Sequence, residues 1–148
     1  MTTTFMARPR GTRLLFADTC YWIALASPKD NLHDKARDVT RFQKSFQIVT
    51  TDEVLSEFLT FISSKEPRLR PQAAKLTRAV LENPQVIVVA QTHDSFLDGL
   101  ALYEQRPDKR YSLGDCVSMQ TMKTWGLTDA LTDDHHFIQE GFRALLKD

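Results

Sequence analysis

Short, continuous apolar runs recur along the chain and alternate with segments in which apolar residues lie three or four positions apart. The clearest run is VIVVA at 86–90, and LLFA spans 14–17. Continuous rather than alternating hydrophobicity is typical of a parallel strand covered on both faces. Residues 46–49, 129–132 and 142–146 give three further short strands. The pattern therefore predicts about five strands.

The segments between these runs carry helical spacing and helix-end signals. Ser112 is a predicted N-cap, and either Thr50 or Thr51 caps the third helix, Thr50 with Glu53 having the spacing of a capping box. We expect helices within 21–27, 31–44, 52–62, 71–82, 93–106 and 113–125, and a helical turn at 135–140. The apolar stripes of these helices include Phe42, Phe61, Phe96, Leu97 and Tyr103.

Strands that alternate with helices throughout indicate an α/β layer fold with a mostly parallel sheet. A chain of 148 residues is long enough for one hydrophobic core. We therefore expect a single domain over residues 14–148, preceded by a flexible N-terminal tail over residues 1–13.

Composition excludes several classes of protein. The 19 basic and 19 acidic residues give a net charge of zero, so the whole molecule does not attract a polyanion. Cys20 and Cys116 are the two cysteines, which gives neither a disulfide framework nor the paired spacing of a zinc site. No apolar run approaches the length of a membrane span. We expect a cytoplasmic protein without a membrane segment.

One local segment is strongly basic although the whole chain is neutral. It carries Lys65, Arg68, Arg70, Lys75 and Arg78. Such a segment is ordinarily a solvated face, but it also suits the phosphate backbone of a nucleic acid, to which it would give affinity without sequence preference.

Acidic residues follow two of the predicted strands. Asp18 follows the first, and Asp133 and Asp134 follow the strand at 129–132, while Asp115 lies in the first turn of the helix after Ser112. Sites in parallel α/β sheets form at the carboxyl ends of the strands. Alone, Asp18 could cap a turn, and Asp115 could favour the helix dipole.

Glu57 adds a further acid to this set, since it lies beside the apolar stripe of its helix, where an unpaired carboxylate is disfavoured. Clustered carboxylates raise one another's pKa, and a divalent cation relieves that cost. Ligation by oxygen alone favours Mg²⁺ or Mn²⁺, which can activate water for attack on phosphorus.

Four motifs in the chain carry a family resemblance. They are DTCYW at Asp18, TTDEVLSEFLTF with Glu57, SLGDCVSMQTM with Asp115, and ALTDDHHFIQEGF near the end. With these motifs the chain resembles PIN-domain ribonucleases, particularly the VapC-like toxins of bacterial toxin–antitoxin pairs. The resemblance implies a three-layer α/β/α sandwich with a mainly parallel central sheet of about five strands. It also implies a metal-dependent endoribonuclease.

The resemblance assigns roles to individual residues. It implies a catalytic site of Asp18, Glu57, Asp115 and Asp134, with Asp18, Asp115 and Asp134 holding Mg²⁺ or Mn²⁺. Asp134 is favoured over Asp133 because it fits the family pattern Asp-x-His-Phe, whereas the family varies at Asp133. Thr19 and Thr132 match hydroxyl positions that support the site. In that pattern, His136 is interpreted as a packing or hydrogen-bonding residue.

Partners follow from the same resemblance. A VapC-like toxin implies an RNA substrate, a cognate antitoxin that covers apolar surface, and a homodimer. Trp22 and the helix through Ile62 are the candidate surfaces. The alternative is a non-catalytic PIN-like module that binds RNA or protein. A phosphoacceptor receiver domain is disfavoured because its acid pair follows the first strand, whereas here the adjacent acids follow a late one.

Overall fold

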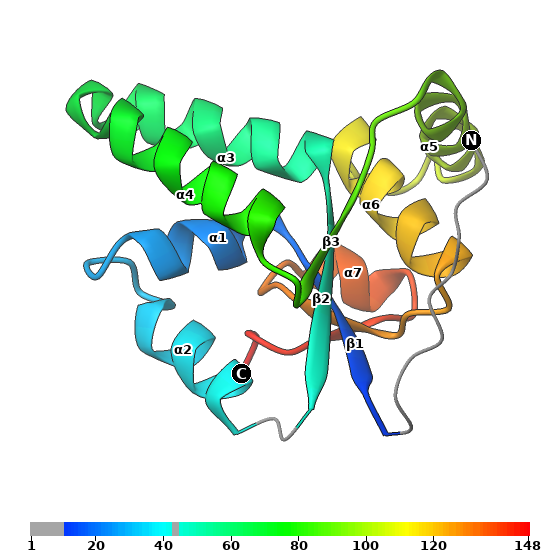
Figure 1. Ribbon diagram of the computed structural model, residues 1–148. Coiled ribbons are helices and arrows are strands. Elements are labelled where there is room, and N and C mark those ends of the chain that lie inside the picture. The colour runs from blue at the N-terminus through cyan, green and yellow to red at the C-terminus, as the bar shows by residue number, and fades with distance from the viewer. Residues whose placement is uncertain (1–10, 43–44) are drawn as a thin grey trace.

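A parallel sheet forms the centre of the molecule (Figure 1). The computed structural model describes residues 11–42 and 45–148, and within them five strands pair in the order β3-β2-β1-β4-β5, each pair parallel. The strands are β1 Arg13–Ala17, β2 Phe46–Thr51, β3 Val86–Val89, β4 Asp129–Leu131 and β5 Arg143–Ala144. All five predicted strands are confirmed, although β5 is shorter than the predicted 142–146.

Helices cover both faces of this sheet. They are α1 Thr19–Ala26, α2 His33–Arg41, α3 Asp52–Lys65, α4 Arg70–Glu82, α5 His93–Gln105, α6 Leu113–Thr124 and α7 His135–Gln139, with a 3₁₀ turn η1 at Pro67–Leu69. Helices α1 to α4 lie on one side and α5 to α7 on the other (Figure 1), as right-handed crossovers in this strand order require. The predicted three-layer α/β/α sandwich is confirmed.

The central strand β1 lies in the densest part of the core. Leu15, Phe16 and Ala17 have no exposed surface, and Phe137 of α7 is equally buried. Each Å² of buried apolar surface contributes about 25 cal/mol to stability, so such strands are the most strongly stabilised part of the fold. The end of β1, where Asp18 follows, is therefore held in a fixed place.

Local signals set most helix starts as predicted. The Thr51 hydroxyl accepts the Val54 N–H over 3.1 Å, so Thr51 is the N-cap of α3. Thr50 instead lies within β2, where its hydroxyl donates to the Ala17 carbonyl over 2.9 Å. The capping box expected from Thr50 and Glu53 is therefore not formed, because the strand continues one residue beyond Thr50.

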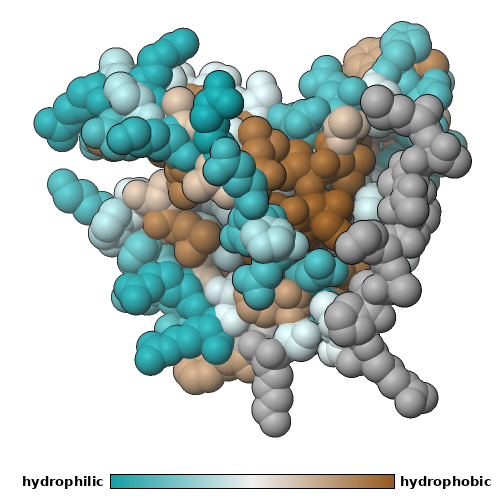
Figure 2. All heavy atoms as spheres, viewed as in Figure 1, coloured by the Kyte–Doolittle hydropathy of each residue, from teal (hydrophilic) through white to brown (hydrophobic). Residues whose placement is uncertain are grey.

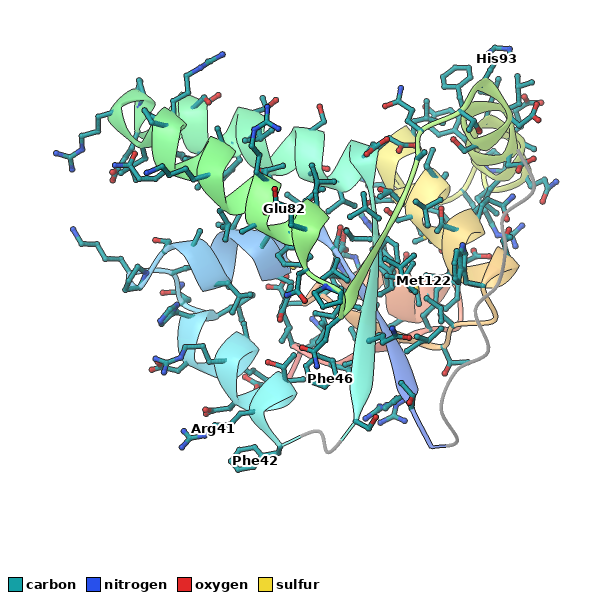
Figure 3. All side chains as sticks on the ribbon, viewed as in Figure 1. Arg41, Phe42, Phe46, Glu82, His93 and Met122 are labelled. Atoms are coloured by element: carbon teal, nitrogen blue, oxygen red, sulfur yellow. The ribbon has the colours of Figure 1, made fainter. Side chains whose placement is uncertain are left out.

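Some apolar residues of the predicted stripes are exposed. Phe42 follows the last turn of α2 and projects outward with 77% of its surface exposed, whereas Met122 of α6 is fully buried (Figure 3). Position 44, the predicted end of that helix, lies outside the described residues. Phe61 on α3 is 38% exposed. Trp22, a predicted surface residue, is instead buried, and its indole N–H donates to Thr50 Oγ1 over 3.3 Å.

Helix α5 packs against α6 at close range. A Cβ added to Gly99 would lie 2.5 Å from Val117 Cγ2, so glycine permits this approach. The outer face of α5 leaves Phe96, Leu97 and Tyr103 at 43%, 44% and 51% exposure. The apolar stripe predicted for this helix is therefore only partly covered within the described residues.

Strand β3 has the composition of a buried strand, covered on both faces, but it is an edge strand whose residues are all half-buried. Most of the predicted tail, residues 1–10, lies outside the described residues. None of the helices in the described part of the chain is long and apolar enough to cross a membrane.

Candidate active site

Asp18 lies where the central strand ends and α1 begins. Its backbone N–H donates to the Leu131 carbonyl of β4 over 3.3 Å. Its side chain caps α1, with Oδ1 accepting the Thr19 N–H over 2.8 Å and Oδ2 accepting the Thr132 hydroxyl over 2.8 Å. The carboxylate is therefore oriented from two elements that are distant in sequence.

The environment of Asp18 disfavours its negative charge. Burial raises the pKa of its carboxyl to about 6, although the hydrogen bonds from Thr132 and Thr19 act in the opposite direction. The nearby charges of Asp115 and Glu57 raise the pKa further. In such surroundings, a bound cation stabilises the ionised form of a carboxylate, because the positive charge offsets the cost of burial and the repulsion from other acids.

Thr132 connects Asp18 to the end of β4. The residue is fully buried, and its Oγ1 accepts the Asp134 N–H over 3.1 Å while donating to Asp18. Cys20 Sγ also lies 3.5 Å from this oxygen, and burial raises the pKa of that thiol to about 12. The Cys20 thiol is therefore neutral, and it packs behind the acidic residues.

Asp115 lies in the first turn of α6, as predicted. It forms a capping box with Ser112, in which Asp115 Oδ2 accepts the Ser112 N–H and the Ser112 hydroxyl accepts the Asp115 N–H, each over 3.0 Å. Burial raises the pKa of Asp115, and the charge of Asp134 adds to the rise. The hydrogen bonds with Ser112 and the neighbouring His136 lower it. A bound cation would therefore stabilise the ionised form of Asp115 as well.

The two adjacent acids after β4 have different surroundings. Asp134 is half-buried and caps α7, its Oδ1 accepting the His136 N–H over 2.9 Å. His136 Nδ1 lies 3.2 Å from Asp134 Oδ1 and 3.5 Å from Asp115 Oδ2. Asp133 is exposed. The structure thus brings Asp134 next to Asp115, with one imidazole between them.

Glu57 reaches the same region from α3. Its Oε2 lies 4.0 Å from the point that a Cβ on Gly114 would occupy, at the start of α6. The residue is exposed, so the cost expected for an unpaired buried carboxylate does not apply to it. The charges of Glu57 and Asp115 act on Asp18, and the charge of Asp134 acts on Asp115, so the four acids lie near one another.

Two buried polar atoms in this region have no hydrogen-bond partner. They are Thr19 Oγ1 and His136 Nδ1. Buried polar atoms are nearly always paired in folded proteins, so an unpaired one beside acidic side chains supports a site that binds water or a ligand. Ligand atoms of Asp134, His135 and His136 also lie within 4.8 Å of one another. Apart from these histidines, the carboxylates of Asp18, Asp115 and Asp134 supply oxygen donors, which fit a divalent cation such as Mg²⁺.

A buried ion-pair network behind His136 was not predicted from the sequence. Glu140 has a side chain only 5% exposed, and it accepts hydrogen bonds from Arg106, Lys123 and Tyr111. Burial alone would raise the pKa of Glu140, but the hydrogen bonds and charges of Arg106 and Lys123 lower it to about 2. His136, in the Asp-x-His-Phe pattern, is the sequence signal that could have pointed to the part of this network next to the acids.

The five basic residues between positions 65 and 78 lie on the arm formed by α3, η1 and α4. All are exposed. Lys65 ends α3 and lies over the ring of Phe61, with Nζ 5.8 Å from the ring centre. It is eight residues beyond Glu57, about 12 Å along the helix. The structure therefore places the basic segment on the arm rather than among the acids.

Comparison with known proteins gives consistent similarities. The model of one protein family, described as PIN domain, matches residues 15–142. The 23S rRNA-specific endonuclease VapC20 from two strains of Mycobacterium tuberculosis is 26% identical over 129 residues, which cover 87% of this chain and 95% of VapC20. A crystal structure of M. tuberculosis VapC20, titled a Sarcin-Ricin loop cleaving toxin, superposes with a TM-score of 0.77 and 26% identity. This match covers 86% of this chain and 95% of the other.

Proposed function

The chain belongs to the PIN-domain family, and from this premise we propose that it is a Mg²⁺- or Mn²⁺-dependent endoribonuclease, the toxin of a toxin–antitoxin pair. One observation carries the proposal. Carboxylates from the ends of β1 and β4 and from the first turn of α6 share one site, and the pKa values of Asp18 and Asp115 are raised there. Such a site is adapted to bind a divalent cation and phosphate oxygens.

Asp18, Asp115 and Asp134 are the proposed metal ligands, and Glu57 faces the site from α3. A bound cation would lower the pKa of a water molecule and neutralise charge on the phosphate. The chain's own groups fix the geometry. Thr132 and the Thr19 N–H orient Asp18. Ser112 orients Asp115, and the half-buried imidazole of His136 keeps Asp115 and Asp134 adjacent.

Ribosomal RNA is the proposed substrate class. The support is the similarity to VapC20, whose name and structure title specify 23S rRNA and the sarcin–ricin loop. RNA-cutting proteins select their target through surface shape and exposed contacts, whereas the acids supply the reaction. On the arm, Lys65, Arg68, Arg70, Lys75 and Arg78 are proposed to contact phosphates flanking the cleaved bond.

An apolar groove between α1, α3 and α4 is the proposed binding surface for an antitoxin. It has a volume of about 730 Å³, and its apolar lining includes Ile23, Phe58, Phe61, Ile62, Leu69 and Leu76. Charged residues also line the groove: the basic Lys29, Lys65 and Arg68 and the acidic Asp30 and Glu66. The apolar lining fits the apolar face of a partner helix. Phe61→Asp should prevent co-purification of the toxin with that partner.

The exposed face of α5 supports the proposal of a homodimer. Phe96, Leu97 and Tyr103 are exposed there. A second apolar surface, seen in Figure 2, lies beside β3 on the face between α4 and α6. Exposed apolar patches of this kind mark protein interfaces. Leu97→Lys should convert a dimer to a monomer, measured by light scattering.

Cleavage of purified ribosomal RNA tests the proposed activity. We expect new 5′ ends at one site with Mg²⁺ or Mn²⁺ and none with a chelator. Asp18→Asn and Asp115→Asn should each abolish cleavage while the circular dichroism spectrum is unchanged. Asp38→Asn, an exposed acid on α2, is the matched control and should cleave normally. A protein that binds RNA but cleaves none with either metal would instead be a non-catalytic binding module.

A further inference from the structure

We propose that Tyr111, anchored by Glu140, is a positioning residue that holds the His136 ring between Asp115 and Asp134. The inference rests on the proposed nuclease function, because its effect on catalysis is exerted through the acids of that site. Tyr111 lies in the loop between α5 and α6, directly before the motif that begins at Ser112, and is itself in none of the four sequence motifs. None of the contacts described above joins Tyr111 to a proposed metal ligand. Its effect on the acids is therefore exerted through the imidazole of His136.

Tyr111 contacts His136 edge-on. The two ring centres are 5.5 Å apart with an interplanar angle of 61°. Tyr111 is 5% exposed, and its hydroxyl donates to Glu140 Oε1 over 3.2 Å. A T-shaped aromatic pair has a preferred geometry, so it restricts the orientation of both rings. The position of the Tyr111 ring therefore limits where the His136 ring can lie.

Glu140, which binds the Tyr111 hydroxyl, is itself held rigidly by several partners. Arg106 binds it in a bidentate pair, Nε to Oε1 over 2.9 Å and Nη2 to Oε2 over 3.0 Å. Lys123 of α6 adds a bond to Oε2 over 2.8 Å. These partners come from the end of α5 and from α6, while Glu140 follows α7. The carboxylate thus joins the three segments around His136.

His136 needs such a support because its own polar contacts do not fix the ring. Nδ1 is buried without a hydrogen-bond partner, although it lies 3.2 Å from Asp134 Oδ1 and 3.5 Å from Asp115 Oδ2. The ring of His135 lies 4.4 Å away on a tilted plane, and that residue is exposed. Tyr111 is the buried aromatic contact. Its loss should let the imidazole, and with it the two carboxylates, rearrange.

A double-mutant cycle with Tyr111→Leu and His136→Ala tests the inference. Single-turnover cleavage of the wild-type RNA site and Mn²⁺ affinity by electron paramagnetic resonance are measured for each protein. Tyr111→Leu should slow cleavage and weaken Mn²⁺ binding by about 10- to 100-fold, the usual effect of losing a group that orients a metal site. The KM for RNA should be unchanged. In the His136→Ala background, Tyr111→Leu should have no further effect.

Two additional variants separate positioning from general stability. Tyr111→Phe keeps the ring but loses the bond to Glu140, so its loss of rate should be smaller than that of Tyr111→Leu. Tyr21→Leu is the matched control: Tyr21 is also buried, packs edge-on against Trp22 and lies on α1. It should lower the melting temperature while retaining Mn²⁺ affinity.

The possible outcomes distinguish this inference from the proposed function. Equal losses from Tyr111→Leu with and without His136, or no loss of rate and affinity, would overturn the positioning role. A wild-type protein that binds Mn²⁺ but cuts no RNA would overturn the nuclease function, and the Mn²⁺ cycle would still decide the role of Tyr111. A wild-type protein that binds no Mn²⁺ would overturn both.

Discussion

Asp18 and Thr132 lie 114 residues apart in the chain, yet Thr132 Oγ1 donates a 2.8 Å hydrogen bond to Asp18 Oδ2. The same hydroxyl accepts the Asp134 N–H over 3.1 Å. One buried threonine therefore sets the position of two acids, one after the central strand and one before α7. This relationship places the proposed metal site at the junction of β1 and β4, which are neighbours in the sheet.

The adjacent acids after β4 should differ in their importance. Asp134→Asn should reduce RNA cleavage by about 100-fold or more, since loss of one charge from a metal site impairs both binding and reaction. Asp133→Asn should change the rate less than about threefold because the side chain is exposed. Single-turnover assays at saturating Mn²⁺ measure both. A greater loss in Asp133→Asn would make Asp133, rather than Asp134, the fourth acid of the site.

Asp18 should make the metal-free protein less stable as pH rises. Its folded pKa of about 6 exceeds the ordinary value of 3.8, so folding favours the protonated form. The stabilisation is complete below pH 4 and is lost as pH rises through 6. In chelator at pH 8, Asp18→Asn should be more stable than wild type by about 1–3 kcal/mol.

Urea titrations at several pH values measure this difference. It should shrink to near zero at about pH 3, below the unfolded pKa of 3.8, where Asp18 is mostly neutral in both states. Mn²⁺ at pH 8 should stabilise the wild type more than Asp18→Asn. Equal stability of the two proteins in chelator at pH 8 would show that the buried carboxylate carries no such cost.

Glu140 should contribute stability with the opposite dependence on pH. Its pKa is lowered from 4.5 to about 2 in the folded state, so its contribution is present above pH 4.5 and is lost as pH falls through 2. Glu140→Gln should lower the free energy of unfolding at pH 7 by on the order of 3 kcal/mol. The difference in unfolding free energy between wild type and Glu140→Gln should become smaller below pH 4. A constant gap down to pH 2 would mean that packing, rather than ion pairing, accounts for the loss.

The contact between α5 and α6 should tolerate no side chain at Gly99. A Cβ there would lie 2.5 Å from Val117 Cγ2 and 3.2 Å from the Val117 backbone N, so the helices must separate. Gly99→Ala should destabilise the fold by about 1–3 kcal/mol despite alanine's better helix propensity. Gly114→Ala is the matched control, since its nearest neighbour would be 3.6 Å away. Thermal unfolding compares them, and equal melting temperatures would contradict the close packing.

Local signals in the sequence were sufficient to locate the strands and most of the acids. Asp18 and Asp134 both act as helix N-caps directly after buried strands, and Ser112 marks the helix that carries Asp115. Each signal extends over only a few residues, so it can be recognised without the fold. The strand order then brings these ends to one edge of the sheet.

Contacts between distant segments were not predictable in the same way. The segment RPDKRY at 106–111 has the composition of a surface loop, yet Arg106 and Tyr111 both bind the buried Glu140. Apolar spacing likewise cannot tell whether a helix face meets its own chain or another molecule. Phe96 and Leu97 of α5 satisfy the helical pattern and are nevertheless exposed.

The position of β1 in the middle of the sheet has a consequence for synthesis on the ribosome. β1 pairs with β2, which follows soon after it, and with β4, which begins at residue 129. A nascent chain that has not yet emerged past β4 holds Asp18, Glu57 and Asp115 but lacks Thr132 and Asp134. The proposed nuclease would therefore be inactive until the segment after β4 has been synthesised and has paired with β1, and a nascent chain without that segment could not cut the RNA around it.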